Sequence, residues 1–299
     1  MQASANNGAT LRQLAVSNTY DRSHWHHGPI DIVLDLHGSI EQIDSAKQAM
    51  WLRFPNCLPE LVGELALLRS PCVSLKSNAF VGAIANRMWQ AVSPFQAQFI
   101  TPMAAVAGSV AQELLHIAKN FGLKKIVVNN GGDVAIYALV DETVTIGLLA
   151  PAGIAEFFFN ESREFGIATS GWSGRSFSLG IAEAVTVVAH NAAQADAAAT
   201  MIANAVGPQI QHDVIRRRPA SSLKDDTDLG EQLVTTKVGF LPIGLVREAL
   251  VQGETYAREL LRRNLILSAS LSLQGESVIV AHSANELAQL QPFQFKLAA

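Results

Sequence analysis

Cysteine is scarce in this chain of 299 residues, which contains only Cys57 and Cys72. Two cysteines cannot build a disulfide framework or a cysteine-rich metal site, so the composition is typical of a protein in a reducing compartment. Charged residues are also few, at 16%, and the formal net charge is −4 without a long basic run. Because nucleic-acid binding depends on a basic footprint, we expect no nucleic-acid partner.

Long apolar runs are absent as well. No stretch approaches the roughly 18 residues that a membrane span needs, and residues 1–23 contain no apolar segment of the signal-peptide type. We therefore expect a cytoplasmic protein without a membrane partner. Hydrophobic residues are plentiful, at 49%, which is enough for a large core in a single domain over residues 24–299. Residues 1–23 are polar, and we expect partial disorder there.

The first part of the chain combines one clear strand pattern with several helix signals. Residues 30–37, IDIVLDLH, alternate apolar and polar side chains as a half-buried strand does. Ser39 and Gln42 have the spacing of a capping box, which predicts a helix to about residue 53. Further helices are expected over about residues 59–69 and 79–92.

Residues 125–151 have the pattern of three short strands joined by two tight turns, near 130–133 and 141–142. Gly131 and Gly132 supply positive φ in the first turn and serve either a hairpin or a ligand loop.

The C-terminal part begins with a charged, turn-rich segment, residues 212–232, for which we predict a long surface loop. A strand near 233–240, a helix over about 243–263 and a hairpin over 265–281 are expected to follow. No glycine-rich dinucleotide motif or P-loop occurs between a strand and a helix. The pattern therefore favours an α+β or mixed-sheet domain over a Rossmann fold.

Three histidines, His24, His26 and His27, lie close together in HWHHGP. Neighbouring side chains of an extended segment point to opposite sides, and no cysteine or carboxylate completes a ligand set. The sequence therefore favours a structural role for these histidines over a metal site.

The segment ITPMAAVAGSVAQELLHIAKNFG has a clear helix start, with Thr101 as N-cap and Pro102 at the first helical position. Small residues continue through Gly108, so the backbone N–H groups of the first turn are not covered by bulky side chains. Such a turn suits either an anionic ligand or close packing against another helix. The residues alone leave both readings open.

The densest cluster of polar chemistry lies in residues 166–200. Thr169, Ser170 and Gly171 form a loop at a predicted strand end, where backbone N–H groups can face a ligand. The run AVTVVA, residues 184–189, is typical of a buried strand. A helix should follow, with Asn191 and Gln194 as a capping box and Gly207 and Pro208 as its stop.

Asp196 and Thr200 are four residues apart in this alanine-rich helix, which places a carboxylate and a hydroxyl on one face. Two such oxygen groups can share a hard cation such as Mg²⁺. The alternative is a solvated or capping pair without a ligand.

Taken in order, TPMAAVAG, NNGGD, ATSG and AVTVVAHNAAQADAAAT resemble the motifs of the ApbE-like superfamily, which includes FAD-dependent FMN transferases. The resemblance covers roughly residues 101–207. It implies an α+β, T-fold-like arrangement of mixed or antiparallel sheets packed with helices, and a phosphorylated heterocycle as small-molecule partner.

The resemblance also implies roles for individual residues. The flavin dinucleotide would be surrounded by the first turn of a helix, a glycine turn and the TSG loop, and Mg²⁺ would be bound by two side chains and one backbone carbonyl. In this sequence the cofactor-binding positions are Ala104, Gly108, Gly131, Gly132, Asp133, Thr169, Ser170 and Gly171, and the metal ligands are Asp196, Thr200 and the carbonyl of Ala104.

Two departures from the family pattern affect catalysis. Ala107 stands before Gly108 where family transferases have lysine, and a segment reading roughly HIIDPRTG is absent between the TSG loop and the last strand. The expected acid–base group is therefore missing. His190 and Arg175 are the remaining candidates: His190 is either catalytic or a polar strand end, and Arg175 either binds phosphate or lies on the surface.

The pattern is similar to a compact branch of the superfamily associated with methanogens and with bacteria that use tetrahydromethanopterin-linked one-carbon metabolism. Three functions remain open on the residues: a magnesium-dependent transferase or hydrolase acting on FAD or a related compound, a flavin- or nucleotide-binding protein without chemistry, and a structural module. The alternative of a factor in that one-carbon metabolism, and homo-oligomerisation, are also left open.

Overall fold

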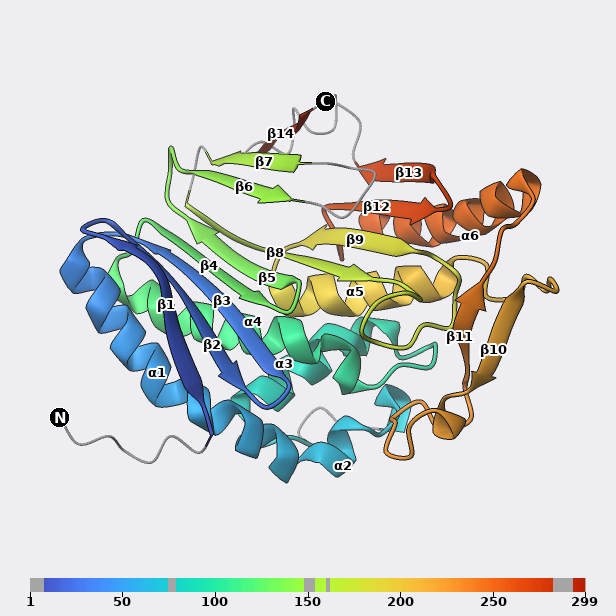
Figure 1. Ribbon diagram of the computed structural model, residues 1–299, viewed down its shortest axis with the longest axis horizontal. Helices are drawn as coiled ribbons and strands as arrows, with labels where there is room; N and C mark the ends of the chain where they lie inside the picture. The colour runs from blue at the N-terminus through green and yellow to red at the C-terminus, as the bar shows by residue number, and fades with distance from the viewer. Residues whose placement is uncertain (1–7, 75–78, 148–153, 160–161, 282–292, 299) are drawn as a thin grey trace.

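The computed structural model describes residues 8–74, 79–147, 154–159, 162–281 and 293–298. Its main feature is a nine-stranded sheet in the order β1-β2-β3-β4-β5-β8-β9-β12-β13, in which every neighbouring pair is antiparallel (Figure 1). The expected α+β class is confirmed. The strands are β1 Thr10–Ser17, β2 Tyr20–His27, β3 Ile30–His37, β4 Lys125–Asn130, β5 Asp133–Ala138, β8 Arg163–Ser170, β9 Ala184–Ala189, β12 Ser268–Leu273 and β13 Glu276–Ala281.

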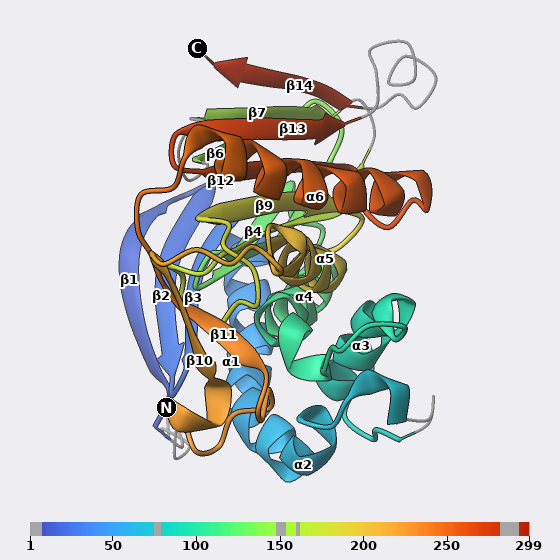
Figure 2. The same cartoon turned by 90° about the vertical axis from the view of Figure 1, so that its right-hand side faces the viewer.

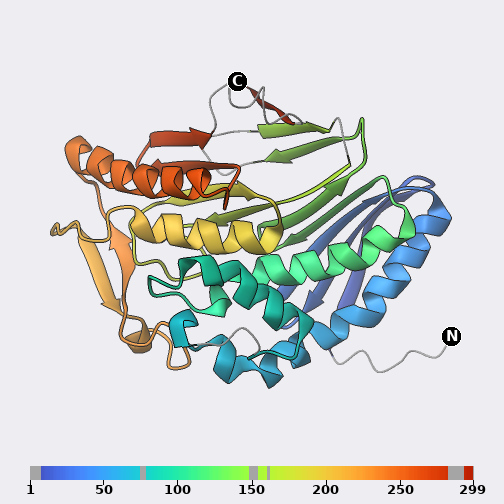
Figure 3. The same ribbon diagram turned by 180° about the vertical axis from the view of Figure 1, so that it is seen from behind.

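Four long helices cover one face of this sheet. From behind, α6, α5, α4 and α1 lie in succession across it (Figure 3), and the main hydrophobic core lies between the two layers. Within the described residues no helix is both long and apolar enough to cross a membrane. The helices are α1 Ile40–Gly63, α2 Leu65–Leu68, α3 Ala83–Val92, α4 Val106–Ala118, α5 Ala192–Ala205 and α6 Ile243–Arg262, with 3-10 turns η1 Cys72–Ser74, η2 Ser93–Phe95, η3 Pro102–Ala105, η4 Lys119–Phe121 and η5 Ala220–Ser222.

The chain enters the sheet earlier than its composition suggests. β1 and β2 form a hairpin that pairs onto β3, so the expected disorder of residues 1–23 is wrong for residues 10–23; residues 1–7 lie outside the described part. The inward face of β2 carries Asp21 and Ser23 beside Trp25, all of them buried. Polar residues on the buried face conceal the apolar alternation by which a strand is usually recognised.

Helix α1 is longer than predicted. The capping box is confirmed, because Ser39 Oγ accepts from the Gln42 backbone N–H and the Gln42 side chain accepts from that of Ser39. The helix continues through Pro55 and Pro59 to Gly63, where two shorter helices were expected. Its buried stripe runs without interruption over both prolines, and this tertiary packing outweighs the local cost of each proline.

Two smaller sheets flank the main layers. The three strands expected over residues 125–151 are present as β4, β5 and β6 (Thr143–Gly147), with residues 148–151 outside the described part; β6 pairs with β7 (Ile154–Phe159), which pairs with β14 (Phe293–Ala298). β10 (Ile215–Pro219) pairs with β11 (Leu233–Val238) in a two-stranded ribbon. This ribbon and α6 face the viewer in Figure 2. The surface loop predicted over residues 212–232 is therefore wrong in part, because it contains β10 and η5.

Candidate functional site

A cavity of about 310 Å³ lies where α5, the start of α4 and the start of β5 meet. We call it the carboxylate cavity, because Asp133 and Asp196 both line it. Ala104, Thr200 and Arg175 line it as well. The fold thus brings together predicted residues from four segments that are far apart in the sequence.

Helix α5 presents a polar stripe to this cavity. Asp196, Thr200 and Asn204 follow one another at four-residue intervals and all line it, whereas most of the remaining side chains of α5 are buried. Asn191 caps the helix by accepting from the Gln194 backbone N–H at 3.0 Å. The predicted capping box is only half formed, because Gln194 Oε1 is buried without a hydrogen-bond partner.

The Asp196 carboxylate lies against the first turn of α4. Its Oδ2 accepts from the Gly108 backbone N–H at 3.0 Å, and the Ala107 N–H also donates to it. A Cβ on Gly108 would lie 2.3 Å from the carbonyl oxygen of Ala192, so this glycine is required for close packing of α4 on α5. Of the two readings of the small-residue turn, the contacts of Gly108 support helix packing.

The helix that contains this turn begins later than predicted. Pro102–Ala105 is a 3-10 turn, and α4 itself starts at Val106. Thr101 does not cap the helix, because its hydroxyl donates to the carboxylate of Asp228 in the segment after β10.

Asp133 follows the Gly131–Gly132 turn, where both glycines have positive φ, at 64° and 117°. Its carboxylate accepts from the Thr169 backbone N–H. Burial raises the pKa of Asp133 to about 7, although that hydrogen bond and the charge of Arg175 oppose the rise. Asp133 is therefore a carboxyl group that is not fully ionised at neutral pH.

Asp196 is perturbed in the same direction. Burial and the neighbouring charge of Asp133 raise its pKa well above the ordinary value, and the two backbone N–H groups only partly offset this. Two carboxylates that face one cavity repel each other, so the pair holds a proton or attracts a cation.

Arg175 is exposed at the mouth of the cavity. Its Nη1 lies 2.6 Å from the position that a Cβ on Gly131 would occupy, so the guanidinium lies directly over the glycine turn. This placement beside two half-buried carboxylates supports a binding role over an unrelated surface position.

The side chains of the TSG loop do not line the carboxylate cavity within the described residues. Thr169 Oγ1 is hydrogen-bonded to Thr186 Oγ1 at 2.8 Å, and only its backbone N–H reaches Asp133. A Cβ on Gly171 would lie 2.2 Å from the carbonyl oxygen of Glu183, so this glycine serves the close approach of two chain segments. Ser170 ends β8 beside it.

His190 is likewise absent from the described lining of the cavity. Its Nε2 lies 3.1 Å from Asn264 Oδ1, next to the end of β9. These contacts match the reading of a polar strand end and give its catalytic role no support.

The three N-terminal histidines are divided between the two faces of β2, as expected. His24 and His26 point away from the core, and His27 is buried against Phe54. No group of three or more His, Cys, Asp or Glu side chains that could hold a metal is found among the described residues.

The family model described as "AbpE bacteria" matches residues 12–279. The chain belongs to this family. A UPF0280 protein of Methanothrix thermoacetophila is 37% identical over 130 residues, which cover 42% of this chain and 53% of that protein. A UPF0280 protein of Methanocaldococcus jannaschii is 40% identical over 124 residues, 39% of this chain and 49% of the relative. The chain therefore spans about half the length of the curated relatives that it matches.

Among solved structures, the apo form of the flavinyl transferase ApbE of Pseudomonas stutzeri covers 93% of this chain and 95% of its own, with a TM-score of 0.37 and 12% identity. The family match extends well beyond residues 101–207, over which the motif resemblance was drawn. The expected membership of the ApbE-like group is confirmed by the family model.

Part of the site of this AbpE-family chain was missed by sequence reasoning. Asn204 continues the interval of Asp196 and Thr200, and that repeated spacing in an alanine-rich helix could have indicated it. Residues 224–229 form another wall of the cavity, where the Asp226 carboxylate pairs with Arg69 at 2.8 Å. No local sequence pattern predicts that these residues line the cavity, because their position depends on the β10–β11 ribbon.

Proposed function

We propose that the carboxylate cavity binds FAD or a related diphosphate-bearing heterocycle together with Mg²⁺. The observation that carries the proposal is the convergence of Asp133 and Asp196 from different elements on one cavity, with the pKa of both raised. Such a pair has an excess of negative charge that a divalent cation would neutralise. The order of motifs and the family membership favour a flavin dinucleotide as the ligand.

The donor groups present fit Mg²⁺. Within the described residues the Thr200 hydroxyl, which lines the cavity, has no hydrogen-bond partner. Mg²⁺ prefers oxygen ligands, needs only one or two carboxylates and retains several waters, so the lack of a larger acidic cluster is no obstacle. Asp196, Thr200 and the Ala104 carbonyl would hold the ion, with Asp133 as a second carboxylate. When bound, Mg²⁺ neutralises the negative charge of a diphosphate.

Arg175 would add a contact to phosphate. Its guanidinium is exposed and lines the cavity over Gly131, where a ligand in the cavity would meet it. A guanidinium donates two parallel hydrogen bonds to phosphate oxygens. Its positive charge also attracts an anionic ligand to the mouth of the cavity.

A second candidate is an enzyme of the transferase or hydrolase class. Asp133 favours it, because a carboxyl group with a pKa of about 7 is suited to general base catalysis at neutral pH. The same carboxylate cannot bind a cation and take up a proton at once, so binding without transfer remains the first proposal. Incubation with FAD, Mg²⁺ and a threonine-containing acceptor peptide distinguishes them: addition of one FMN mass supports transfer, and an unchanged peptide mass supports binding alone.

Binding itself is tested by thermal unfolding. At a hundredfold excess over Kd, FAD with Mg²⁺ should stabilise the protein by about 2.7 kcal/mol, which raises Tm by roughly 5 °C for a chain of this size. Asp196→Ala should abolish the shift. His190→Ala, outside the cavity, should retain it. No shift in the wild-type protein, or an undiminished shift in Asp196→Ala, would contradict the proposal.

A further inference from the structure

A second cavity adjoins the carboxylate cavity. It has a volume of about 640 Å³ and lies between α5, α6 and residues 98–99. Phe99, Leu179, Met201 and Asn204 line both cavities, so the two share a wall. We call the second cavity the apolar chamber.

The chamber offers no unpaired charge to a ligand. Its walls include Pro208 as well as the three shared apolar side chains, and Glu259 at its rim is paired with Arg262 at 2.8 Å. Burial raises the pKa of Tyr256 to about 12, so the phenol stays neutral, and its hydroxyl donates to Gln98 Oε1 at 3.1 Å. Apolar walls with a few amide and hydroxyl groups are suited to an uncharged heterocyclic ring and unsuited to a second phosphate.

Asn204 stands at the junction of the two cavities. Its Oδ1 accepts from the Leu179 backbone N–H at 2.9 Å and from Ser178 Oγ at 3.3 Å. These bonds fix the orientation of the amide, since only its oxygen can accept. Within the described residues Nδ2 has no hydrogen-bond partner, so its two N–H groups are available to an oxygen atom of a molecule that lies across both cavities.

The sizes of the two cavities also suit one elongated ligand. Pockets for small molecules and cofactors measure about 300–1,000 Å³. The carboxylate cavity alone is at the lower end of that range, and the two together reach its upper end. A dinucleotide-sized ligand therefore needs both.

We propose that the apolar chamber binds the uncharged ring of the ligand whose anionic part lies beside Asp133 and Asp196, with Asn204 Nδ2 donating to an oxygen between the two parts. This inference rests on the proposed function of the carboxylate cavity. It assigns the ring to the α5–α6 side of the site and makes Asn204 a determinant of which ligands can span the junction.

Filling the chamber tests the inference. Gln252 lines it from α6, and Gln252→Trp should occupy the space of the ring; Val251→Trp, at an adjacent residue that is 57% exposed, is the matched control. Binding of two probes, FAD with Mg²⁺ and inorganic pyrophosphate with Mg²⁺, is measured by calorimetry. Gln252→Trp should weaken FAD binding at least tenfold and change pyrophosphate binding less than twofold. The control should bind both probes as the wild-type protein does.

The two proposals fail in different ways. If Gln252→Trp binds FAD as tightly as the wild-type protein, the ring lies elsewhere and the chamber assignment is overturned while the carboxylate cavity stands. If the wild-type protein binds neither probe, the proposed function and the inference fall together. Thr255→Trp, at the exposed rim of the same chamber, decides the question should Gln252→Trp fail to fold.

Discussion

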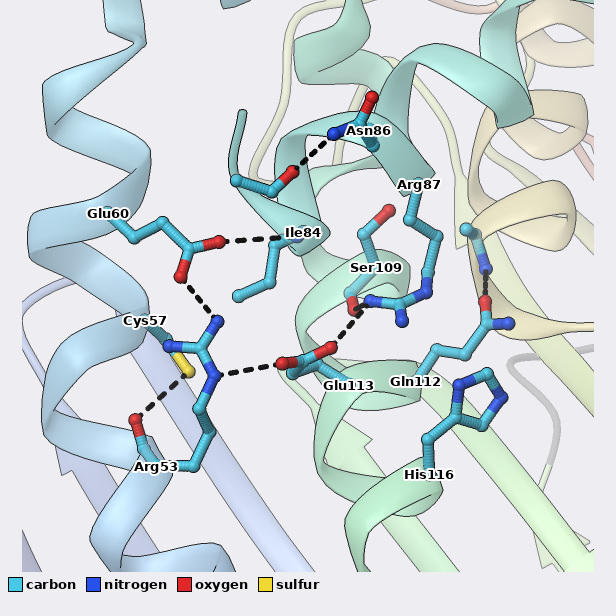
Figure 4. Close-up of polar contacts among 12 residues, drawn as sticks. Arg53, Cys57, Glu60, Ile84, Asn86, Arg87, Ser109, Gln112, Glu113 and His116 are labelled. Carbon is cyan, nitrogen blue, oxygen red and sulfur yellow. Dashed lines mark hydrogen bonds and ion pairs between the residues drawn. The ribbon is translucent and has the colours of Figure 1, made fainter. Parts of the chain in front are cut away.

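Two clusters of charged side chains lie beside helix α4, and they differ in whether their charges are balanced. In the first, Glu113 of α4 lies between Arg53 of α1 and Arg87 of α3 (Figure 4), with Oε1 2.8 Å from Arg53 Nε and Oε2 3.0 Å from Arg87 Nη1. Arg53 also reaches Glu60. Burial acts to raise the pKa of Glu113, but the two arginines outweigh it and the pKa lies below the ordinary value. We call this the arginine–glutamate cluster.

The second cluster is the carboxylate pair at the N-terminal end of the same helix. Here Asp196 has backbone N–H donors and a like-charged neighbour, Asp133, and its pKa is raised. A cluster whose charges balance joins helices together, whereas a cluster with excess charge stores unfavourable energy that a ligand of opposite charge can relieve. The difference separates a structural feature from a candidate binding site.

Removing the carboxylate of Glu113 from the arginine–glutamate cluster should have the largest effect on the stability of the protein. Glu113→Ala leaves Arg87 without its carboxylate and Arg53 with Glu60 alone, and the partial burial of all three side chains makes this costly. We expect the free energy of unfolding to fall by about 3 kcal/mol, measured by urea denaturation. The stabilisation by FAD with Mg²⁺ should be unchanged in size, because the cluster does not line the cavity.

The control for this prediction is Glu254→Ala, which breaks a more exposed pair with Arg258 on α6. Its cost should be below about 1 kcal/mol. Equal costs for the two variants would mean that the arginine–glutamate cluster contributes no more than a surface ion pair.

The sequence predicted those elements in which local pattern and burial agree. The β-branched run Ala184–Ala189 is a strand with the expected bounds, and Asp196 and Thr200 share a face because the following helix is continuous. Strand β2 was missed because its buried Asp21 pairs with Lys47 of α1 at 2.7 Å, a partner that no local pattern reveals. Polar residues with distant partners resemble loop residues in the sequence.

The candidate site shows the same limit. Asp133 and Asp196 could each be selected from a motif, yet their mutual repulsion depends on β5, β8 and α5 lying side by side. The wall formed by residues 224–229 depends on the tertiary placement of a segment beyond β10. Sequence therefore indicated the chemistry of the site, and only the fold gives its electrostatics.

The smallest expected effect is the pH dependence of stability, which should have opposite signs for the carboxylate pair and for the arginine–glutamate cluster. Because the pKa of Asp133 rises from 3.8 to about 7 on folding, the folded protein holds more protons than the unfolded chain between these values, and its stability falls as pH rises through that window. Glu113 behaves in the opposite way: its contribution is present above 4.5 and is lost as pH falls.

Asp133→Asn removes the contribution of Asp133, since the amide oxygen can still accept from the Thr169 N–H while the charge is removed. With EDTA present, the Tm of the wild-type protein should fall between pH 5 and pH 8 by an amount that corresponds to about 2–3 kcal/mol for Asp133. Asp133→Asn should remove that part of the fall and leave the part that the burial of Asp196 causes. Asp141→Asn, in an exposed turn, should keep the whole fall. Mg²⁺ should restore wild-type stability at pH 8 and should stabilise Asp133→Asn less, because this variant keeps Asp196 and Thr200 but lacks the second carboxylate. A wild-type Tm that does not change across this range would show that burial and mutual repulsion do not raise the pKa of the two carboxyl groups.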